Sequence, residues 1–208
     1  MVKIENLTKI CKRKKVLDNI NYTFENGKVY GLCGANGSGK TMLLRSIAGL
    51  IRANSGSVLI NDKVLHKDIT FPNSLGIIIE NMELLPYLNS WDNLALLAKI
   101  KKIATKDDIE DSLKRVGLDS ELKVEKYSLG MKQKLNIAQA IFEKPELILL
   151  DEPTNALDEK SIELVHKIIR EEAERGAVVI IASHNKYDIE ACCDHIIKMN
   201  NGCMEVIQ

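Results

Sequence analysis

The fold of this 208-residue chain is decided by the stretch Gly34-Ala35-Asn36-Gly37-Ser38-Gly39-Lys40-Thr41. The stretch fits the pattern G-x-x-x-x-G-K-[ST], follows the apolar run Val29 to Cys33, and precedes apolar residues at helical spacing as far as Ile51. Glycines let the backbone curl so that successive N–H groups point inward, and a helix N-terminus adds partial positive charge. The sequence therefore predicts a strand, a phosphate-binding loop and a helix in succession, rather than a simple glycine turn.

Each polar residue of this loop has a distinct predicted role. Lys40 can reach the β- and γ-phosphates of a nucleotide, and the Thr41 hydroxyl can ligate Mg²⁺. The ligand predicted by this chemistry is Mg-ATP. The residues expected to hold it are Gly34, Ala35, Asn36, Gly37, Ser38, Gly39, Lys40, Thr41 and Met42.

A second motif places two carboxylates after an apolar run. Leu147 to Leu150 reads as a strand, and Asp151 and Glu152 follow it, so both acids emerge at the carboxyl end of a parallel sheet, where ligands bind. Taken alone, such a pair is more often a solvated turn. Beside a phosphate loop, we expect Asp151 to hold Mg²⁺ and Glu152 to act as the base that polarises the attacking water.

The order of elements predicts a single α/β domain over residues 1–208, with a P-loop NTPase core and a mostly parallel sheet. The first 70 residues read as an N-terminal antiparallel β region, and residues 81–142 read as a helical lobe inserted in the core. The expected strands are Val2–Leu7, Ile20–Phe24, Val29–Cys33, Ile77–Ile79, Leu147–Leu150 and Val178–Ala182, with short strands near Ile196 and Val206. The expected helices are Thr41–Ile51, Asp92–Lys101, Lys106–Val116, one from Ser128 towards Phe142, and Asp158–Arg175, with turns at residues 25–27 and 54–56.

Composition excludes several classes of function. Lys and Arg number 29 against 29 Asp and Glu, and the basic residues are scattered apart from Lys12 to Lys15, so no nucleic-acid partner is expected. The charged amino terminus and the lack of any apolar run near about 20 residues predict neither a signal peptide nor a membrane span. The five cysteines have no C-x-x-C spacing, so we expect reduced thiols in a cytoplasmic protein.

Three further motifs carry a resemblance to a known family. The stretch Tyr127-Ser128-Leu129-Gly130-Met131-Lys132-Gln133-Lys134 resembles the signature motif of ABC ATPases, Asn155-Ala156-Leu157-Asp158 resembles their D-loop, and Ser183-His184 resembles their switch histidine. The resemblance implies that Ser128 and Gly130 contact the γ-phosphate of ATP held by the opposite subunit of a head-to-tail homodimer or of a paired ABC subunit. It also implies that His184 contacts the γ-phosphate and takes part in catalysis. Without the resemblance to ABC ATPases, Ser128 would be interpreted as a helix N-cap and His184 as a structural residue.

Two positions depart from the family pattern. Cys11 stands where an aromatic residue commonly stacks on adenine, which predicts weaker affinity for the base. Glu80 stands at the glutamine of the Q-loop, where a carboxylate can ligate Mg²⁺ or hold the lytic water, although it could also be a surface residue. Glu80 and the Ser-Leu-Gly-Met-Lys-Gln signature resemble the ATP-binding subunits of bacterial bacitracin- and lantibiotic-immunity exporters.

The resemblance implies an ATPase that drives an integral-membrane permease from the cytoplasmic face of the cell membrane. The family docks its permease after the Q-loop, which corresponds here to residues 81–93 with Leu84, Leu85, Tyr87 and Leu88; these apolar residues could equally be core of the lobe. The main alternative is a soluble single-domain ABC ATPase of an assembly system. A P-loop kinase or GTPase is disfavoured by the signature motif and by the position of His184.

Overall fold

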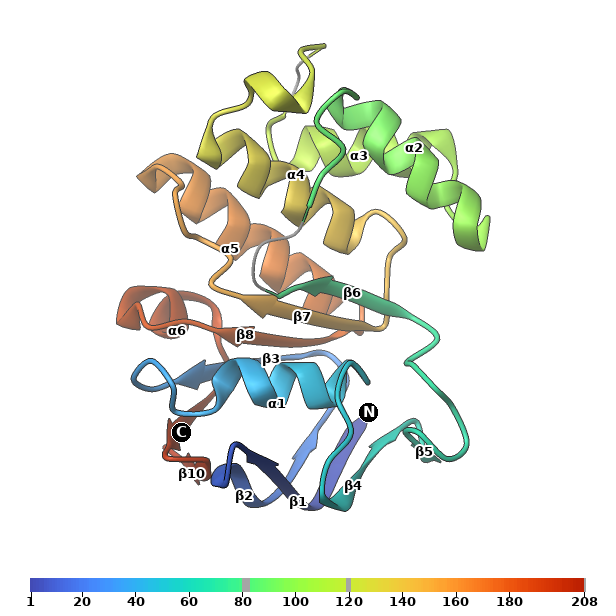
Figure 1. Ribbon diagram of the computed structural model, residues 1–208. Coiled ribbons are helices and arrows are strands. Elements are labelled where there is room, and N and C mark those ends of the chain that lie inside the picture. The colour runs from blue at the N-terminus through green and yellow to red at the C-terminus, as the bar shows by residue number, and fades with distance from the viewer. Residues whose placement is uncertain (80–82, 119–120, 208) are drawn as a thin grey trace.

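Two β-sheets of different kinds organise the chain, whose computed structural model describes residues 1–79, 83–118 and 121–207 (Figure 1). The first sheet is antiparallel with strand order β2-β1-β4-β5. The second has the order β10-β9-β3-β8-β7-β6, in which all neighbouring strands run parallel except β10, which is antiparallel to β9. This arrangement confirms the predicted α/β class with a mostly parallel sheet and an antiparallel N-terminal region.

The elements have the following bounds. The strands are β1 (Val2–Cys11), β2 (Lys14–Phe24), β3 (Lys28–Cys33), β4 (Ser55–Ile60), β5 (Lys63–Val64), β6 (Leu75–Ile78), β7 (Leu147–Asp151), β8 (Val178–Ala182), β9 (His195–Asn200) and β10 (Cys203–Val206). The helices are α1 (Lys40–Ile47), α2 (Ser90–Lys101), α3 (Lys106–Arg115), the 3₁₀ turn η1 (Val124–Lys126), α4 (Leu129–Ile141), α5 (Glu159–Glu174) and α6 (Lys186–Cys192).

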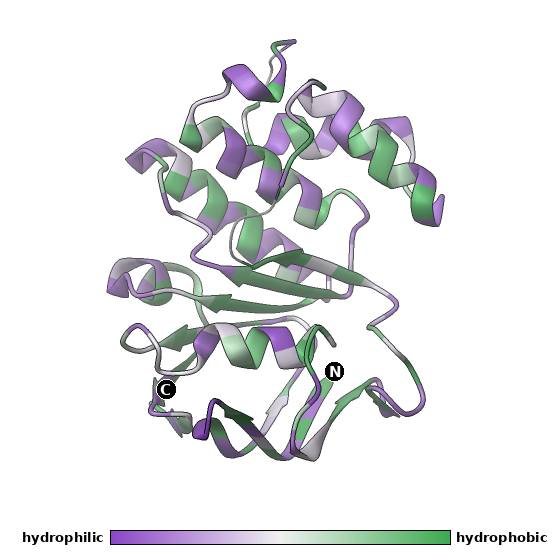
Figure 2. Cartoon of the chain, in the orientation of Figure 1, coloured by the Kyte–Doolittle hydropathy of each residue, from purple (hydrophilic) through white to green (hydrophobic). Residues whose placement is uncertain are grey.

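The parallel sheet is apolar on both faces, as sheets covered by helices on both sides are (Figure 2). Alternate residues of β7 point in opposite directions: Leu147 and Leu149 join one buried cluster, and Ile148 and Leu150 join another. The first cluster contains α1 and the antiparallel sheet, and the second contains helices α2 to α5. Helix α1 therefore lies between the two sheets, and α4 and α5 cover the opposite face (Figure 1).

Helix α1 is shorter than the sequence predicts. It ends at Ile47 rather than Ile51, because Gly49 adopts a φ of 77° and reverses the chain. The N–H of Leu50 donates to the carbonyl of Arg45 at 3.0 Å, and that of Gly49 to Ser46 at 3.2 Å, which is the Schellman pattern. The prediction was wrong here because Leu50 and Ile51 continue the helical spacing of apolar residues beyond the glycine that stops it.

Helices α2 and α3 begin at side-chain caps and pack with α4 at the end of the molecule farthest from the antiparallel sheet (Figure 1). Asn89 caps α2 by accepting from the N–H of Asp92 at 2.8 Å, so the helix starts two residues earlier than expected. Thr105 and Asp108 form a capping box at the start of α3. These helices lie between β6 and β7 in the chain, where the inserted lobe is predicted; the lobe's limits, residues 81 and 142, stay a prediction.

Other differences concern ends and short elements. Strands β1 and β2 extend beyond their predicted limits, and β6 spans Leu75–Ile78 rather than residues 77–79. Ser55 and Gly56 belong to β4 rather than to a turn, because Gly56, with a φ of 80°, lies at a register shift against β1. Helix α6 was not predicted, since seven residues are too few to show a helical period.

Two negative findings apply to the described residues. All five cysteines are free. Within residues 1–79, 83–118 and 121–207, no helix combines the length and the apolar character that a membrane crossing requires.

Candidate functional site

The predicted phosphate loop connects β3 to α1 and is held in a conformation that requires glycine. Gly34 has a φ of 149°, and a Cβ there would lie 2.3 Å from the carbonyl oxygen of Met199; Gly39, at φ 115°, would place one 2.6 Å from that of Val16. Lys40 is buried, and its Nζ donates to the carbonyls of Gly34 at 2.7 Å and Ala35 at 3.4 Å. These two bonds hold the ammonium group across the loop.

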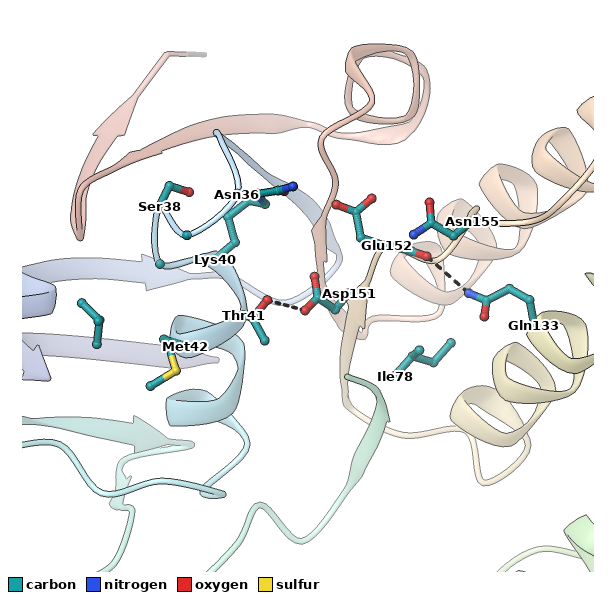
Figure 3. A pocket seen from close by; sticks show the side chains of 13 residues that line it. Asn36, Ser38, Lys40, Thr41, Met42, Ile78, Gln133, Asp151, Glu152 and Asn155 are labelled. Carbon is teal, nitrogen blue, oxygen red and sulfur yellow. Dashed lines mark hydrogen bonds between the residues drawn. The ribbon is translucent and has the colours of Figure 1, made fainter. Parts of the chain in front are cut away.

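A cavity of about 470 Å³ opens on this loop and reaches the carboxyl ends of β6 and β7 (Figure 3). Its predicted members are residues 36–42, Asp151 and Glu152. The full lining consists of Val16, Asn36, Gly37, Ser38, Gly39, Lys40, Thr41, Met42, Ile78, Gln133, Asp151, Glu152 and Asn155. Gly34 and Ala35 contribute through the carbonyls that hold Lys40.

Two observations in this cavity fit a phosphate and a hard cation. The hydroxyl of Ser38 is buried and has no hydrogen-bond partner among the residues that the structure describes, so a ligand oxygen would satisfy it. The Thr41 hydroxyl donates to Asp151 Oδ2 at 2.6 Å, which places two oxygen ligands of the kind Mg²⁺ prefers side by side. Among the described residues, no group of three or more His, Cys, Asp or Glu could hold a metal, so Mg²⁺ here would also need oxygens from phosphate or water.

Glu152 lies just beyond β7 in a strained backbone conformation. Its φ of 50° is in the left-handed region, which costs a non-glycine residue on the order of 1–3 kcal/mol. Its N–H donates to the carbonyl of Ala182 at 2.8 Å, and Gln133 Nε2 donates to the carbonyls of Glu152 at 3.3 Å and Pro153 at 2.8 Å. These bonds hold a turn after β7. Because of this turn, the carboxylates of Asp151 and Glu152 point in different directions (Figure 3).

The Glu152 carboxylate is paired with His184. Oε1 lies 2.8 Å from His184 Nδ1 and accepts the His184 N–H at 3.1 Å. The His184 side chain is 60% exposed and the Glu152 side chain 22%, so the pair lies at the open edge of the site. The structure thus brings together Lys40, Thr41, Asp151, Glu152 and His184, as the sequence predicts; their catalytic roles stay predictions.

Ser128 and Gly130 lie in a different cavity, of about 550 Å³, and no described residue lines both cavities. Ser128 caps α4 by accepting from the N–H of Met131 at 3.2 Å, and Leu129 beside it is 73% exposed. This cavity is lined by Ser128, Leu129, Gly130, Met131, Lys134, Ala156, Leu157, Asp158 and Ser161. Within one chain, Ser128 and Gly130 therefore lie away from the phosphate loop, although Gln133 of the same signature stretch lines the first cavity.

Two predicted positions have no confirmed place in the site. Glu80 lies outside the described residues. Cys11 is half-buried in β1 and is not among the residues that line the 470 Å³ cavity, and the lining residues within the described part of the chain include no aromatic side chain.

Sequence reasoning did not assign Val16, Ile78, Gln133 and Asn155 to the cavity. Gln133 lies in the signature-like stretch before β7, and Asn155 lies in the D-loop-like stretch after it. Membership of these motifs could have placed both residues near the site. Val16 and Ile78 are apolar strand residues, and nothing in their local pattern distinguishes them from core.

The comparisons with known proteins agree with this geometry. The family profile described as ABC transporter matches residues 17–155, which include the phosphate loop, the signature and both acids. The chain belongs to the ABC transporter family. Bacillus subtilis (strain 168) has an uncharacterized ABC transporter ATP-binding protein, YybJ, that is 58% identical over 99% of this chain and 95% of its own length.

The predicted subfamily resemblance is also confirmed. The bacitracin transport ATP-binding protein BcrA of Bacillus licheniformis is 37% identical over 97% of this chain and 67% of its own length. The lantibiotic transport ATP-binding protein SrtF of Streptococcus pyogenes is 35% identical over 94% of this chain and 85% of its own length.

Solved structures of ABC ATPases share the fold. The dimeric structure of the bacterial ABC transporter cassette MJ0796 is 26% identical and superposes with a TM-score of 0.89, over 100% of this chain and 99% of the other. A dimeric post-hydrolysis structure of MJ0796 bound to ADP and Pi gives a TM-score of 0.84 with the same identity and coverage.

Proposed function

We propose that this ABC protein binds and hydrolyses Mg-ATP and couples hydrolysis to transport by a separate integral-membrane permease. The observation that carries the hydrolytic part is the Glu152–His184 contact of 2.8 Å at the edge of a cavity that also holds Lys40 and the Thr41–Asp151 pair. Those groups provide a cation for phosphate, two oxygen ligands for Mg²⁺ and a carboxylate beside an imidazole.

The chemistry assigns one role to each group. Glu152 accepts a proton from the water that attacks the γ-phosphorus, the bond between this phosphorus and the bridging oxygen of ADP breaks, and Lys40 offsets negative charge on the phosphates. His184 orients the Glu152 carboxylate through Nδ1 and contacts the γ-phosphate. Thr41 and Asp151 would hold Mg²⁺, which when bound neutralises charge on the phosphate oxygens.

We infer that the active form is a head-to-tail dimer. Support comes from the separation of the two cavities within one chain, from the exposed N-terminus of α4 at Ser128 and Gly130, and from the dimeric state of MJ0796. In such a dimer, the signature of one chain would close the phosphate loop of its partner.

The permease contact is proposed for residues 83–93, at the cytoplasmic face of the cell membrane. Tyr87 is 60% exposed there, and Asn93 braces the segment by accepting from the Leu85 N–H at 2.9 Å and donating to its carbonyl at 3.2 Å. Leu84, by contrast, packs against the buried cluster of the helical region, as the lobe-core interpretation predicts. Similarity to BcrA and SrtF supports antimicrobial-peptide export; the alternative is a soluble ABC ATPase of an assembly system.

The Glu152→Gln variant tests the hydrolytic proposal. An amide preserves the shape of the side chain but cannot accept the proton, so we expect hydrolysis to fall by roughly 10²–10⁴-fold with ATP binding retained. ATP should then trap a dimer on size exclusion. Hydrolysis above a tenth of the parent rate would show that Glu152 is not the base.

Co-purification tests the transport proposal. Tagged chain extracted from its host in mild detergent should retain an integral-membrane protein, and Tyr87→Ala should weaken that association while leaving ATP hydrolysis of the isolated chain unchanged. Isolation of the parent with soluble proteins alone would favour the assembly-ATPase alternative.

A further inference from the structure

A carboxylate that the proposed mechanism does not use lies buried behind the catalytic pair. Asp188, in α6, is 0% exposed. Its Oδ2 accepts hydrogen bonds from Thr154 Oγ1 at 2.6 Å and Ser183 Oγ at 3.1 Å, and its Oδ1 lies 2.9 Å from His166 Nε2. Three segments therefore meet at one side chain: the turn after β7, the end of β8, and α5.

Asp188 is an anion in this setting. Burial raises the pKa of the Asp188 carboxyl, but hydrogen bonds from His166, Thr154 and Ser183 favour its charged form and hold the pKa below its ordinary value. A carboxylate only accepts hydrogen bonds, so His166 presents Nε2–H to it, and both hydroxyls donate.

The Ser183 hydroxyl has one hydrogen and two carboxylates within reach. Asp188 Oδ2 lies 3.1 Å from Ser183 Oγ, whereas Glu152 Oε2 lies 3.5 Å from it, and Ser183 Oγ also accepts the N–H of Asn185 at 3.0 Å. The shorter bond, to the buried anion, takes the hydrogen. Glu152 Oε2 thus keeps its lone pairs, which a base needs in order to accept a proton from water.

We propose that Asp188 is a positioning residue for ATP hydrolysis: it fixes the segments on either side of Glu152 and keeps the Ser183 hydroxyl from donating to the Glu152 carboxylate. Thr154 follows Glu152 by two residues, and Ser183 precedes His184, so one buried acid sets the placement of both members of the catalytic pair. His166 contacts Asp188 Oδ1, whereas Thr154 and Ser183 both donate to Oδ2. This inference rests on the proposed role of Glu152 as the base.

Asp188→Asn tests the proposal. The asparagine amide can donate to Ser183 Oγ and turn the hydroxyl hydrogen towards Glu152 Oε2, where it competes with the attacking water for that oxygen. We expect kcat to fall by about tenfold, a fraction of the roughly 10²–10⁴-fold that a general base contributes, while KM and the ATP affinity by calorimetry stay within about twofold. A kcat equal to that of the parent would overturn the proposal.

Ser183→Ala distinguishes this role from a purely structural one. With no hydroxyl at position 183, Asp188→Asn has no hydrogen to redirect, so the double variant should retain nearly the kcat of Ser183→Ala alone. If Asp188→Asn instead lowers kcat by the same factor with and without the Ser183 hydroxyl, the proposed route through Ser183 is wrong.

Two His166 variants test the positioning role of Asp188 even if Asp188→Asn does not fold. His166→Gln offers an amide N–H to Asp188 Oδ1, and His166→Leu does not. We expect the Gln variant to retain most of the parent kcat and the Leu variant to lose several-fold; equal kcat values for the two would contradict the proposal.

Glu172→Gln is the matched control for stability. Glu172 is also buried on α5, 2% exposed, and accepts from Arg115 at 2.6 Å and Arg175 at 2.7 Å, but it lines neither cavity. Its variant should lower the melting temperature without changing kcat at 25 °C. Glu152→Gln, measured in parallel, separates the two hypotheses: full activity in that variant refutes the proposed base, whereas an inactive Glu152→Gln beside a fully active Asp188→Asn refutes only the role of Asp188.

Discussion

The cavity at the phosphate loop and the cavity at the signature are similar in size, about 470 and 550 Å³, but differ in chemistry. In the first, the side chains already engage one another: Lys40 holds the loop, Thr41 contacts Asp151, and Glu152 contacts His184. The second offers a helix N-terminus capped by Ser128, with the exposed Leu129 beside it. In the proposed function, this difference means that the first region binds the nucleotide and the second completes the site of a partner chain.

The largest effect is expected when the Lys40 ammonium group is removed from the cavity at the phosphate loop. Lys40→Ala deletes charge-assisted hydrogen bonds to phosphate worth about 1.5–3 kcal/mol, so ATP affinity should fall by roughly 10- to 150-fold, and hydrolysis should fall with it. Isothermal titration calorimetry measures the affinity. Unchanged affinity would mean that the loop does not bind phosphate as its geometry indicates.

A charge placed in the second region should break the dimer while sparing nucleotide binding. Ser128→Glu adds a carboxylate where the partner's γ-phosphate would approach, so hydrolysis should fall by about tenfold through like-charge repulsion, with ATP affinity within about twofold of the parent. In a Glu152→Gln background, size exclusion should no longer show the ATP-trapped dimer. Ser128→Thr, which keeps the capping oxygen, is the control and should still dimerise. A dimer that persists in Ser128→Glu would contradict the head-to-tail arrangement.

The two regions also differ in how far the sequence could predict them. The phosphate loop, Asp151 and Glu152 were predicted because each follows directly from local sequence. The loop joins an apolar strand to the next helix, and the two acids follow an apolar strand. The Glu152–His184 contact and the Asp188 network depend instead on how β7, β8 and α6 pair in three dimensions, and α6 is too short to recognise by period. Ser128 was assigned to the γ-phosphate only through family resemblance, since its local chemistry is that of an ordinary helix N-cap, which accepts the N–H of Met131.

A smaller effect is expected at Glu80, whose position in the site stays a prediction. A third carboxylate near Asp151 and Glu152 would be repelled in the empty site and relieved by a divalent cation. In Glu80→Gln, the Mg²⁺ concentration for half-maximal hydrolysis should therefore change several-fold, and transport-linked activity should fall more than basal hydrolysis. Fold and dimerisation should persist. An unaltered Mg²⁺ profile with unaltered transport would leave Glu80 as a surface residue.

The smallest expected effect concerns Asp108 in α3, a helix that packs on α4, where the signature lies. Asp108 Oδ2 accepts from the Thr105 N–H at 2.8 Å, and Asp108 Oδ1 lies 2.5 Å from Lys144 Nζ, so this side chain completes the capping box of α3 and ties α3 to the segment just after α4. Lys144 and Thr105 together lower the pKa of Asp108 from 3.8 to about 2. Because the folded-state pKa is depressed, the stabilisation is complete above pH 4 and is lost as the pH falls towards 2.

Asp108→Asn removes the charge that pairs with Lys144 while Thr105 remains the N-cap, so it should lower the free energy of unfolding by about 1 kcal/mol at pH 7, the upper end for an exposed ion pair, and by progressively less below pH 4. Urea unfolding at pH 7 and at pH 3 measures both values. Since α3 packs on α2 and α4, ATP affinity should stay unchanged while the ATP-trapped dimer of the Glu152→Gln background weakens by about twofold. An equal loss of nucleotide affinity would show that the two regions are coupled within one chain, and that the signature end does more than complete the site of a partner.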